Sequence, residues 1–170
     1  GETVTEYETA FADFCDTDHA VATSNGTTAL HTALHALGIG EGDRVVTTPF
    51  SFVASANAIR FCGAEPVFAD IDPETYNLDP HAVESVVQNQ DVDAILAVHL
   101  YGLPADMDHL GDIADTYDLA LIEDAAQAHG ARHDGRPVGS IGDVGTFSFY
   151  PTKNMTTGEG GALVTDREDV

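Results

Sequence analysis

Lys153 is the only lysine in the chain, and its surroundings suit a chemical role. It follows an apolar run at 146–150, typical of a buried strand, and precedes a glycine-rich segment at 158–161. A desolvated lysine amine loses its proton more readily, and the neutral amine is a nucleophile that can form a Schiff base with a carbonyl group. The alternative is an ordinary surface lysine. Chains this acidic, with a net charge of −23, tend to discard surface lysines, which favours a role for the one that remains.

The segment 24–27, with the sequence Ser-Asn-Gly-Thr, has the composition of an anion site. It separates a predicted strand at 19–23 from a predicted helix whose apolar residues run from Ala29 to Leu37. At such a junction the free backbone N–H groups of Gly26 and Thr27 point toward a ligand. An ordinary helix N-cap with no ligand is the alternative, and it is the commoner case for such a turn alone.

Four further side chains are placed where ligands bind in α/β proteins. Asp124 and Gln127 follow a predicted strand at 119–123, Phe52 follows one at 44–48, and Ser148 lies within the apolar run before Lys153. Each has a plainer interpretation: Asp124 as a helix N-cap, Phe52 as core packing and Ser148 as the donor of a backbone hydrogen bond.

Strands and helices alternate along the chain. The remaining strands are predicted at 66–70, 94–99 and 162–165, and short extended pieces flank a turn at Asp134-Gly135. Helices are predicted at the amino terminus, at 51–60, after an Asp79 N-cap and after an Asp106 N-cap. Short, continuously apolar strands alternating with helices indicate an α/β fold with a largely parallel sheet covered on both faces. Ligands of such sheets bind beyond the carboxyl ends of the strands, where all of these side chains fall.

Together the candidates form the set that pyridoxal phosphate requires. Its phosphate needs backbone N–H groups and hydroxyls, and its aldehyde needs a lysine. Its ring nitrogen needs a carboxylate, so that the protonated ring can act as an electron sink.

Six strings in the chain resemble the DegT/DnrJ/StrS family of sugar aminotransferases, and they run in the family's order over nearly the whole length. They are SNGTTAL, TPFSFVASANAI, GAEPVFADID, VHLYGLPADMD, IEDAAQAHGA and FSFYPTKNMTTGEGGALVTD. The resemblance implies the three-layer large domain of the fold-type I, aspartate aminotransferase-like enzymes, with a mixed and mostly parallel sheet.

The resemblance also implies a role for each candidate residue. Lys153 would carry the cofactor and Asp124 would pair with its ring nitrogen. Gln127 would lie at the ring hydroxyl, Phe52 would stack on the ring, and Gly26, Thr27 and Ser148 would hold the phosphate. Related dehydratases carry histidine in place of the lysine, so Lys153 favours transamination from glutamate to a keto sugar, which the resemblance implies is linked to a nucleotide. A dehydratase, or a truncated and catalytically silent cofactor-binding protein, are the alternatives.

The family has a short segment before the position of Gly1 and a small carboxyl-terminal domain after the position of Val170. Residues 1–170 are therefore expected to be an incomplete large domain. The missing part would supply substrate contacts, and the neighbouring subunit of a homodimer would supply further cofactor contacts.

The composition limits the possible partners and location of the protein but indicates no activity. The charge of −23 argues against nucleic acid or anionic membranes as partners, and we interpret it as a halophile's means of staying soluble in concentrated salt. Cys15 and Cys62 are far apart with no C-x-x-C spacing, so we expect two small buried side chains, with neither a metal site nor a disulfide framework. No apolar run is long enough to span a bilayer and no signal peptide is evident, which favours the cytoplasm.

Overall fold

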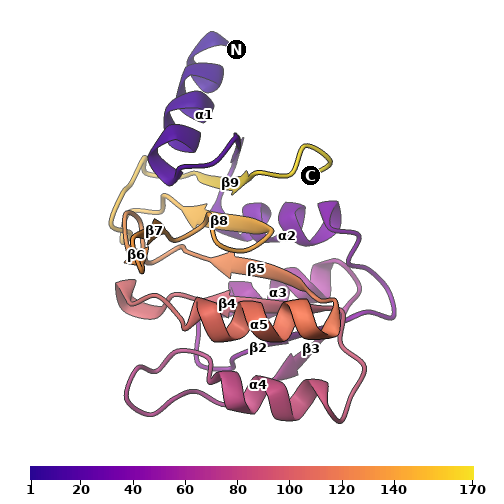
Figure 1. The fold of residues 1–170 in the computed structure, drawn as a ribbon. Coiled ribbons are helices and arrows are strands. Elements are labelled where there is room, and N and C mark those ends of the chain that lie inside the picture. The colour runs from indigo at the N-terminus through magenta and orange to yellow at the C-terminus, as the bar shows by residue number, and fades with distance from the viewer.

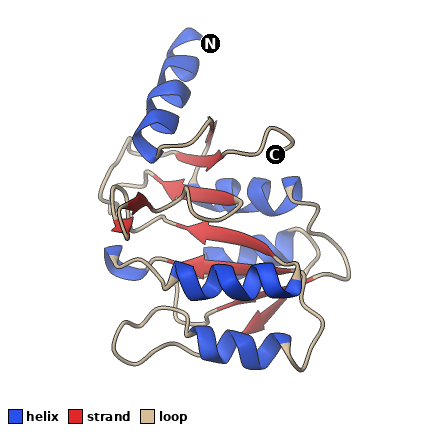
Figure 2. Cartoon of the chain, viewed as in Figure 1, coloured by secondary structure: helices blue, strands red, loops and turns tan.

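A seven-stranded mixed sheet forms the centre of the molecule, with the strand order β1-β9-β8-β5-β4-β2-β3. A computed structural model describes all of residues 1–170. Figures 1 and 2 show the sheet and the helices around it. Parallel pairing joins β2, β3, β4, β5 and β8, whereas β9 runs antiparallel to both β8 and β1. The strands are β1 (His19–Thr23), β2 (Arg44–Thr47), β3 (Glu65–Phe68), β4 (Ala94–Val98), β5 (Ala120–Asp124), β8 (Val144–Ser148) and β9 (Gly161–Thr165).

Helices cover both faces of the sheet, so the predicted three-layer α/β fold is confirmed. In Figure 1, α4 and α5 lie in front of the sheet while α2 and α3 lie behind it. The helices are α1 (Glu2–Cys15), α2 (Gly26–Ala36), α3 (Ala54–Phe61), α4 (Pro80–Val87) and α5 (Met107–Tyr117). A 3-10 turn, η1 (Leu100–Gly102), follows β4, and a small hairpin joins β6 (Arg132–His133) to β7 (Arg136–Pro137).

Alternate residues of the central strands enter two separate cores. Val45 and Leu96 pack with α2 and α3, whereas their neighbours Val46 and Ile95 pack with α4 and α5. All five residues of β4 are buried. A strand covered on both faces must be apolar on both sides of its pleat, which explains the unbroken apolar runs in the sequence.

The predicted elements are confirmed, with shifts at their ends. Asp79 and Asp106 are N-caps whose carboxylates accept from the backbone N–H groups of His81 and His109. The helix predicted at 51–60 begins only at Ala54, because the three preceding residues form a turn with no side-chain cap. That turn, and not a helix face, carries Phe52 out of the core.

The first helix packs only part of its apolar stripe. Tyr7 and Phe11 contact the Phe149 ring edge-on, and Phe11 is buried beneath the helix. Val4 and Phe14, which lie at helical spacing from these two residues, remain 47% and 45% exposed. Part of the apolar face of α1 is therefore left uncovered by residues 1–170.

Both cysteines are free, and they differ in burial. Cys15 is a buried residue of the core under α1, where desolvation and the charge of Glu123 raise its pKa to about 12. Cys62 is only half-buried, so the expectation of burial was wrong for it.

No helix of the structure combines the length and apolar character that crossing a membrane requires.

Candidate cofactor site at the carboxyl edge of the sheet

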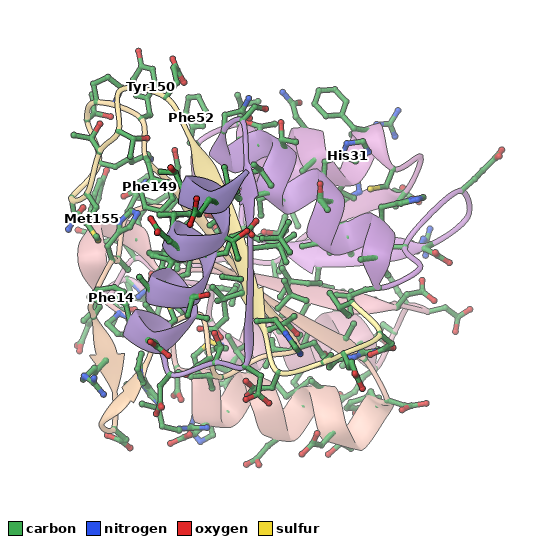
Figure 3. The ribbon with its side chains drawn as sticks, turned by 90° about the horizontal axis from the view of Figure 1, so that it is seen from above. Phe14, His31, Phe52, Phe149, Tyr150 and Met155 are labelled. Atoms are coloured by element: carbon green, nitrogen blue, oxygen red, sulfur yellow. The ribbon has the colours of Figure 1, made fainter.

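One cavity of about 310 Å³ lies beyond the carboxyl ends of the parallel strands, and all seven predicted site residues line it. They are Gly26, Thr27, Phe52, Asp124, Gln127, Ser148 and Lys153. Figure 3 shows Phe52 and Tyr150 next to each other at this edge of the molecule. Several other lining residues were not predicted as site residues from the sequence, among them Asn25, Ser51, Tyr150, Thr152 and Glu159. Their polar side chains lie in loops, where the sequence carries no periodic signal to single them out.

The anion-binding end of the cavity is the start of α2. Asn25 is the N-cap, and its Oδ1 accepts from the Thr28 N–H at 2.9 Å. The N–H groups of Gly26 and Thr27, the first two in the helix, have no hydrogen-bond partner in the chain. Free N–H groups and the positive end of the helix dipole suit a phosphate. An N-cap is thus present, but it is Asn25, and it leaves the two predicted donors available.

Gly26 is required by packing as well as by the site. A Cβ at this position would lie 2.6 Å from the Cβ of Ser148 and 3.2 Å from its Oγ. The absence of a side chain therefore brings the start of α2 against the end of β8, so that a hydroxyl and two N–H groups meet at one point.

We expect Gly26→Ala to destabilise the fold by about 1–3 kcal/mol, the usual cost of overpacking. It should also weaken phosphate binding, because α2 and β8 must move apart. Urea unfolding and cofactor titration measure the two effects. Gly111→Ala is the matched control, since a Cβ there meets nothing within 4 Å, and in a helix interior it should stabilise by about 0.5–1 kcal/mol. Equal effects from the two substitutions would contradict the packing argument.

Asp124 is a buried carboxylate with no cationic partner. Its Oδ2 accepts from the Ser55 hydroxyl at 2.8 Å, and its Oδ1 accepts from the Ala126 N–H at 3.2 Å. Ser55 is in turn within 3.0 Å of the Ser51 hydroxyl. No ion pair of the chain includes Asp124, and desolvation raises its pKa. The protonated ring nitrogen of pyridoxal phosphate would supply the positive charge that Asp124 lacks in this chain.

The plainer interpretation of Asp124 as a helix N-cap is wrong. Residues 125–131 form turns and no helix begins there. The Ser55 partner was not predicted, because Ser55 lies 69 positions before Asp124 and no local pattern links the two residues.

Glu123, the neighbour of Asp124 on the other face of β5, has a lowered pKa, whereas that of Asp124 is raised. Burial alone would raise its pKa, but the hydrogen bond from His99, together with backbone N–H groups of Gly139 and Gly142, lowers it. Its Oε2 lies 2.9 Å from His99 Nε2, and its Oε1 accepts from Gly142 N–H at 2.8 Å. Glu123 is therefore satisfied within the chain, which leaves Asp124 as the carboxylate available to a ligand.

Phe52 and Gln127 lie at the open side of the cavity. Phe52 is 67% exposed, so core packing is excluded as its role. The Oε1 atom of Gln127 accepts from the Tyr101 N–H at 2.9 Å. With its oxygen held by the backbone, the side chain offers its Nε2 amide as a donor.

Lys153 lies in a turn after β8, and its backbone N–H donates to the Tyr150 carbonyl at 2.9 Å. The loop beyond it is fastened to Phe149, whose N–H donates to Gly160 at 2.8 Å. The Lys153 side chain is only half-buried, so the predicted desolvation is not supplied by this chain. β8 ends at Ser148, earlier than the predicted strand, which leaves the lysine on an open turn.

Ser148 lies at the end of β8 with a hydroxyl that is nearly free. Its only hydrogen bond in the chain is accepted from the Tyr150 N–H at 3.5 Å, a weak contact. A backbone hydrogen bond is thus a poor explanation for this buried hydroxyl, and a phosphate oxygen is a better partner for it.

His129 packs against the rings of Phe147 and Phe149, with centroid distances of 5.3 and 5.4 Å. Both ring nitrogens are buried without a hydrogen-bond partner. Desolvation lowers the pKa of His129 to about 4 from its usual 6.5; the nearby Ser148 backbone opposes this shift, and the charge of Lys153 adds to it. The ring is therefore neutral in the folded protein at neutral pH.

This pKa shift predicts a pH-dependent loss of stability. Below about pH 6.5 the unfolded chain binds a proton at His129 that the folded chain refuses until about pH 4, so stability falls as the pH is lowered through this range. We expect His129→Leu to remove this part of the loss. Urea unfolding of both proteins at a series of pH values gives the difference between them, in which the many shared carboxylates cancel. Parallel curves would contradict the assignment.

A buried acid, a lysine on a turn, an aromatic plate and an anion-binding helix start together describe a site for pyridoxal phosphate. The sequence model of the DegT/DnrJ/EryC1/StrS aminotransferase family matches residues 1–170, and the chain belongs to this family.

Relatives with a stated activity are similar over nearly the whole chain. GDP-perosamine synthase of Caulobacter vibrioides is 48% identical over 100% of this chain and 46% of its own length. L-glutamine:scyllo-inosose aminotransferase of Streptomyces griseus is 49% identical over 97% of this chain and 39% of its own length. The solved structure of NtdA from Bacillus subtilis, with bound cofactor PMP, superposes with a TM-score of 0.92 at 37% identity, over 99% of this chain and 38% of that one. The chain spans less than half the length of these proteins.

Proposed function

We propose that residues 1–170 are the cofactor-binding part of a pyridoxal-phosphate-dependent aminotransferase that transfers an amino group to a keto sugar. The observation that carries the proposal is the convergence of seven residues from separate strands and turns on one cavity, with the unpaired carboxylate of Asp124 among them. Family membership and the bound PMP of the Bacillus subtilis structure support the cofactor.

Each residue has a task that its position suits. The Gly26 and Thr27 N–H groups and the Ser148 hydroxyl hold the phosphate. The Phe52 ring would stack on the cofactor ring, and the Gln127 amide would donate to its ring hydroxyl. Asp124 would pair with the ring nitrogen and keep it protonated, and the Lys153 Nζ would be the amine that reacts with the cofactor's aldehyde.

When bound, pyridoxal phosphate accepts the electron pair left on the donor's α-carbon as the proton departs, and later returns it. The chain's part in that step is proton transfer. The Lys153 Nζ would act as the general base that takes the proton from the donor's α-carbon, and as the general acid that returns it to the carbon skeleton shared by cofactor and donor. Asp124 preserves the positive charge that draws the electrons into the ring.

Substrates are proposed from the relatives. The name of the Caulobacter vibrioides protein contains a GDP-linked sugar, which supports a nucleotide-linked keto sugar. We propose glutamate as the amino donor. The name of the Streptomyces griseus protein gives glutamine, so both donors belong in an assay. The dehydratase alternative is disfavoured by the lysine at position 153.

We further propose that residues 1–170 are an incomplete large domain, that a small domain follows, and that the whole protein is a cytoplasmic homodimer suited to concentrated salt. The large aromatic side chains of Phe50, Phe52, Tyr101 and Tyr150 are exposed near the cavity, which supports their covering by a partner subunit. The net charge of −23 supports the salt requirement. Sedimentation of the whole protein in concentrated and in dilute salt tests the homodimer and the salt requirement.

The function is tested by assaying the whole protein that contains this chain. It is supplied with pyridoxal phosphate, a nucleotide-linked keto sugar, and glutamate or glutamine. The products are identified by mass spectrometry. An amino sugar formed together with the corresponding keto acid is the expected result. A product that has lost its hydroxyl without gaining nitrogen would point to the dehydratase, and cofactor binding without any product would favour the silent protein.

A further inference from the structure

The orientation of Gln127 depends on a backbone N–H in an unusual conformation. That donor belongs to Tyr101, which lies in the loop 99–105 with φ 55° and ψ 21° and is followed by Gly102 at φ 90°. A left-handed tyrosine costs about 1–2 kcal/mol, so its surroundings must hold it in place. Its own side chain does not do so, because it is 79% exposed.

Asn77 holds the loop on both sides of Tyr101. Its Oδ1 accepts from the Leu100 N–H at 2.9 Å, and its Nδ2 donates to the carbonyls of Leu103 at 3.0 Å and Pro104 at 3.1 Å. The side chain is 2% exposed and comes from the segment between β3 and α4. Its three hydrogen bonds therefore bracket the one residue whose N–H reaches Gln127.

A second anchor fixes the end of the same loop. His99 Nδ1 accepts from the Ala105 N–H at 3.0 Å, so the ring proton is on Nε2, which donates to Glu123 at 2.9 Å. Both side chains are fully buried. The loop is thereby tied to β5 one residue before Asp124, which leaves its middle, held by Asn77, as the part that sets Tyr101.

We propose that Asn77 is a positioning residue for the cofactor site: it holds the Tyr101 N–H where it fixes the Gln127 oxygen and turns the Gln127 Nε2 toward the cavity. The inference rests on the proposed function, since it assigns Gln127 a donor role toward the cofactor. Asn77 lies outside the cavity lining, so its effect on the cofactor must pass through the loop. A residue that only stabilised the fold would lower the unfolding free energy without any dependence on Gln127.

The test is a double-mutant cycle in the whole protein, with pyridoxal phosphate titrated by absorbance. Asn77→Ala and Gln127→Ala should each raise the Kd about 3–10-fold, the usual range for one hydrogen bond, and the double variant should bind no more weakly than Gln127→Ala alone. Asn89→Ala is the matched control, because this exposed asparagine bonds only the Ser85 carbonyl on α4 and should leave the Kd unchanged.

Hydrogen exchange of the cofactor-free protein supplies a readout that needs no ligand. The Leu100 and Tyr101 amides should be protected in the unsubstituted protein and should exchange faster in Asn77→Ala. If that variant fails to fold, Asn77→Asp keeps the Leu100 acceptor while removing both donors. Unprotected amides in the unsubstituted protein would overturn the inference by themselves.

Two outcomes of the titration separate this inference from the proposed function. If Asn77→Ala raises the Kd by the same factor with and without Gln127, or not at all, the positioning role is wrong while the cofactor site stands. If Gln127→Ala leaves the Kd unchanged, the donor role proposed for Gln127 fails, and the positioning role fails with it.

Discussion

Lys153→Ala is expected to abolish amino transfer by the whole protein while the fold survives. The substitution removes the only lysine amine in residues 1–170, so no neighbouring lysine of this chain can replace it. General acid–base catalysis alone accounts for about 10²–10⁴-fold in rate, and the loss of the covalent link adds to that. Because Lys153 is half-buried on an open turn, its removal leaves no large cavity and should change the unfolding free energy by no more than about 0.5 kcal/mol.

Lys153→Arg should be equally inactive, since it keeps the positive charge but cannot form the link. Arg60→Ala, which removes an exposed charge from α3, is the control and should retain full activity. Steady-state assays and urea unfolding of all three proteins separate chemistry from folding. Turnover of Lys153→Ala near the unsubstituted rate would refute the assignment.

Asp124→Asn is expected to lower turnover about 10²–10³-fold, a magnitude typical of removing one preorganised electrostatic group from an active site. An amide cannot keep the ring nitrogen protonated, so the electrons from the donor lose their sink. The cofactor-free fold should lose no stability at neutral pH. Desolvation raises the pKa of Asp124, so its burial becomes costly as the pH rises through that pKa, whereas asparagine carries no such cost.

Asp118→Asn makes the same chemical change at an exposed position, the C-cap of α5 with φ 56°, where asparagine is well tolerated. It should leave both rate and stability as they are. Rate and unfolding free energy are measured on both variants. If Asp124→Asn loses stability but keeps its turnover, Asp124 is a structural residue and the proposed pairing with the ring nitrogen is wrong.

The sequence predicted the sheet and seven of the 16 residues that line the cavity, because both depend on apolar runs and on the residues that follow them. Unbroken apolar runs such as β4 indicated strands that are buried on both faces. Asp124 and Ser148 lie at the carboxyl ends of two such strands, β5 and β8. The residues at strand ends are close in space whenever the sheet is parallel, so their convergence followed from the fold class.

The contacts that orient the site could not be predicted in the same way. Ser55 reaches Asp124 across 69 positions and Asn77 reaches Leu100 across 23, and no periodicity in the sequence reports either pair. The half-buried setting of Lys153 was also missed, since the apolar run before it suggested a strand that extends two residues further than β8 does. Pairings of this kind depend on how loops pack, and loop packing leaves no local pattern.

Trapping the cofactor on the chain tests the central claim most directly. The whole protein is incubated with pyridoxal phosphate, reduced with borohydride, digested and analysed by peptide mass spectrometry. Borohydride converts the C=N bond between a lysine amine and the cofactor aldehyde into a stable secondary amine. We expect the mass of the reduced cofactor on the peptide that contains Lys153 and on no other peptide, and we expect it to be absent from Lys153→Ala. A label on any other peptide, or an unlabelled Lys153 peptide in a protein that binds the cofactor, would contradict the assignment of this cavity as the cofactor site.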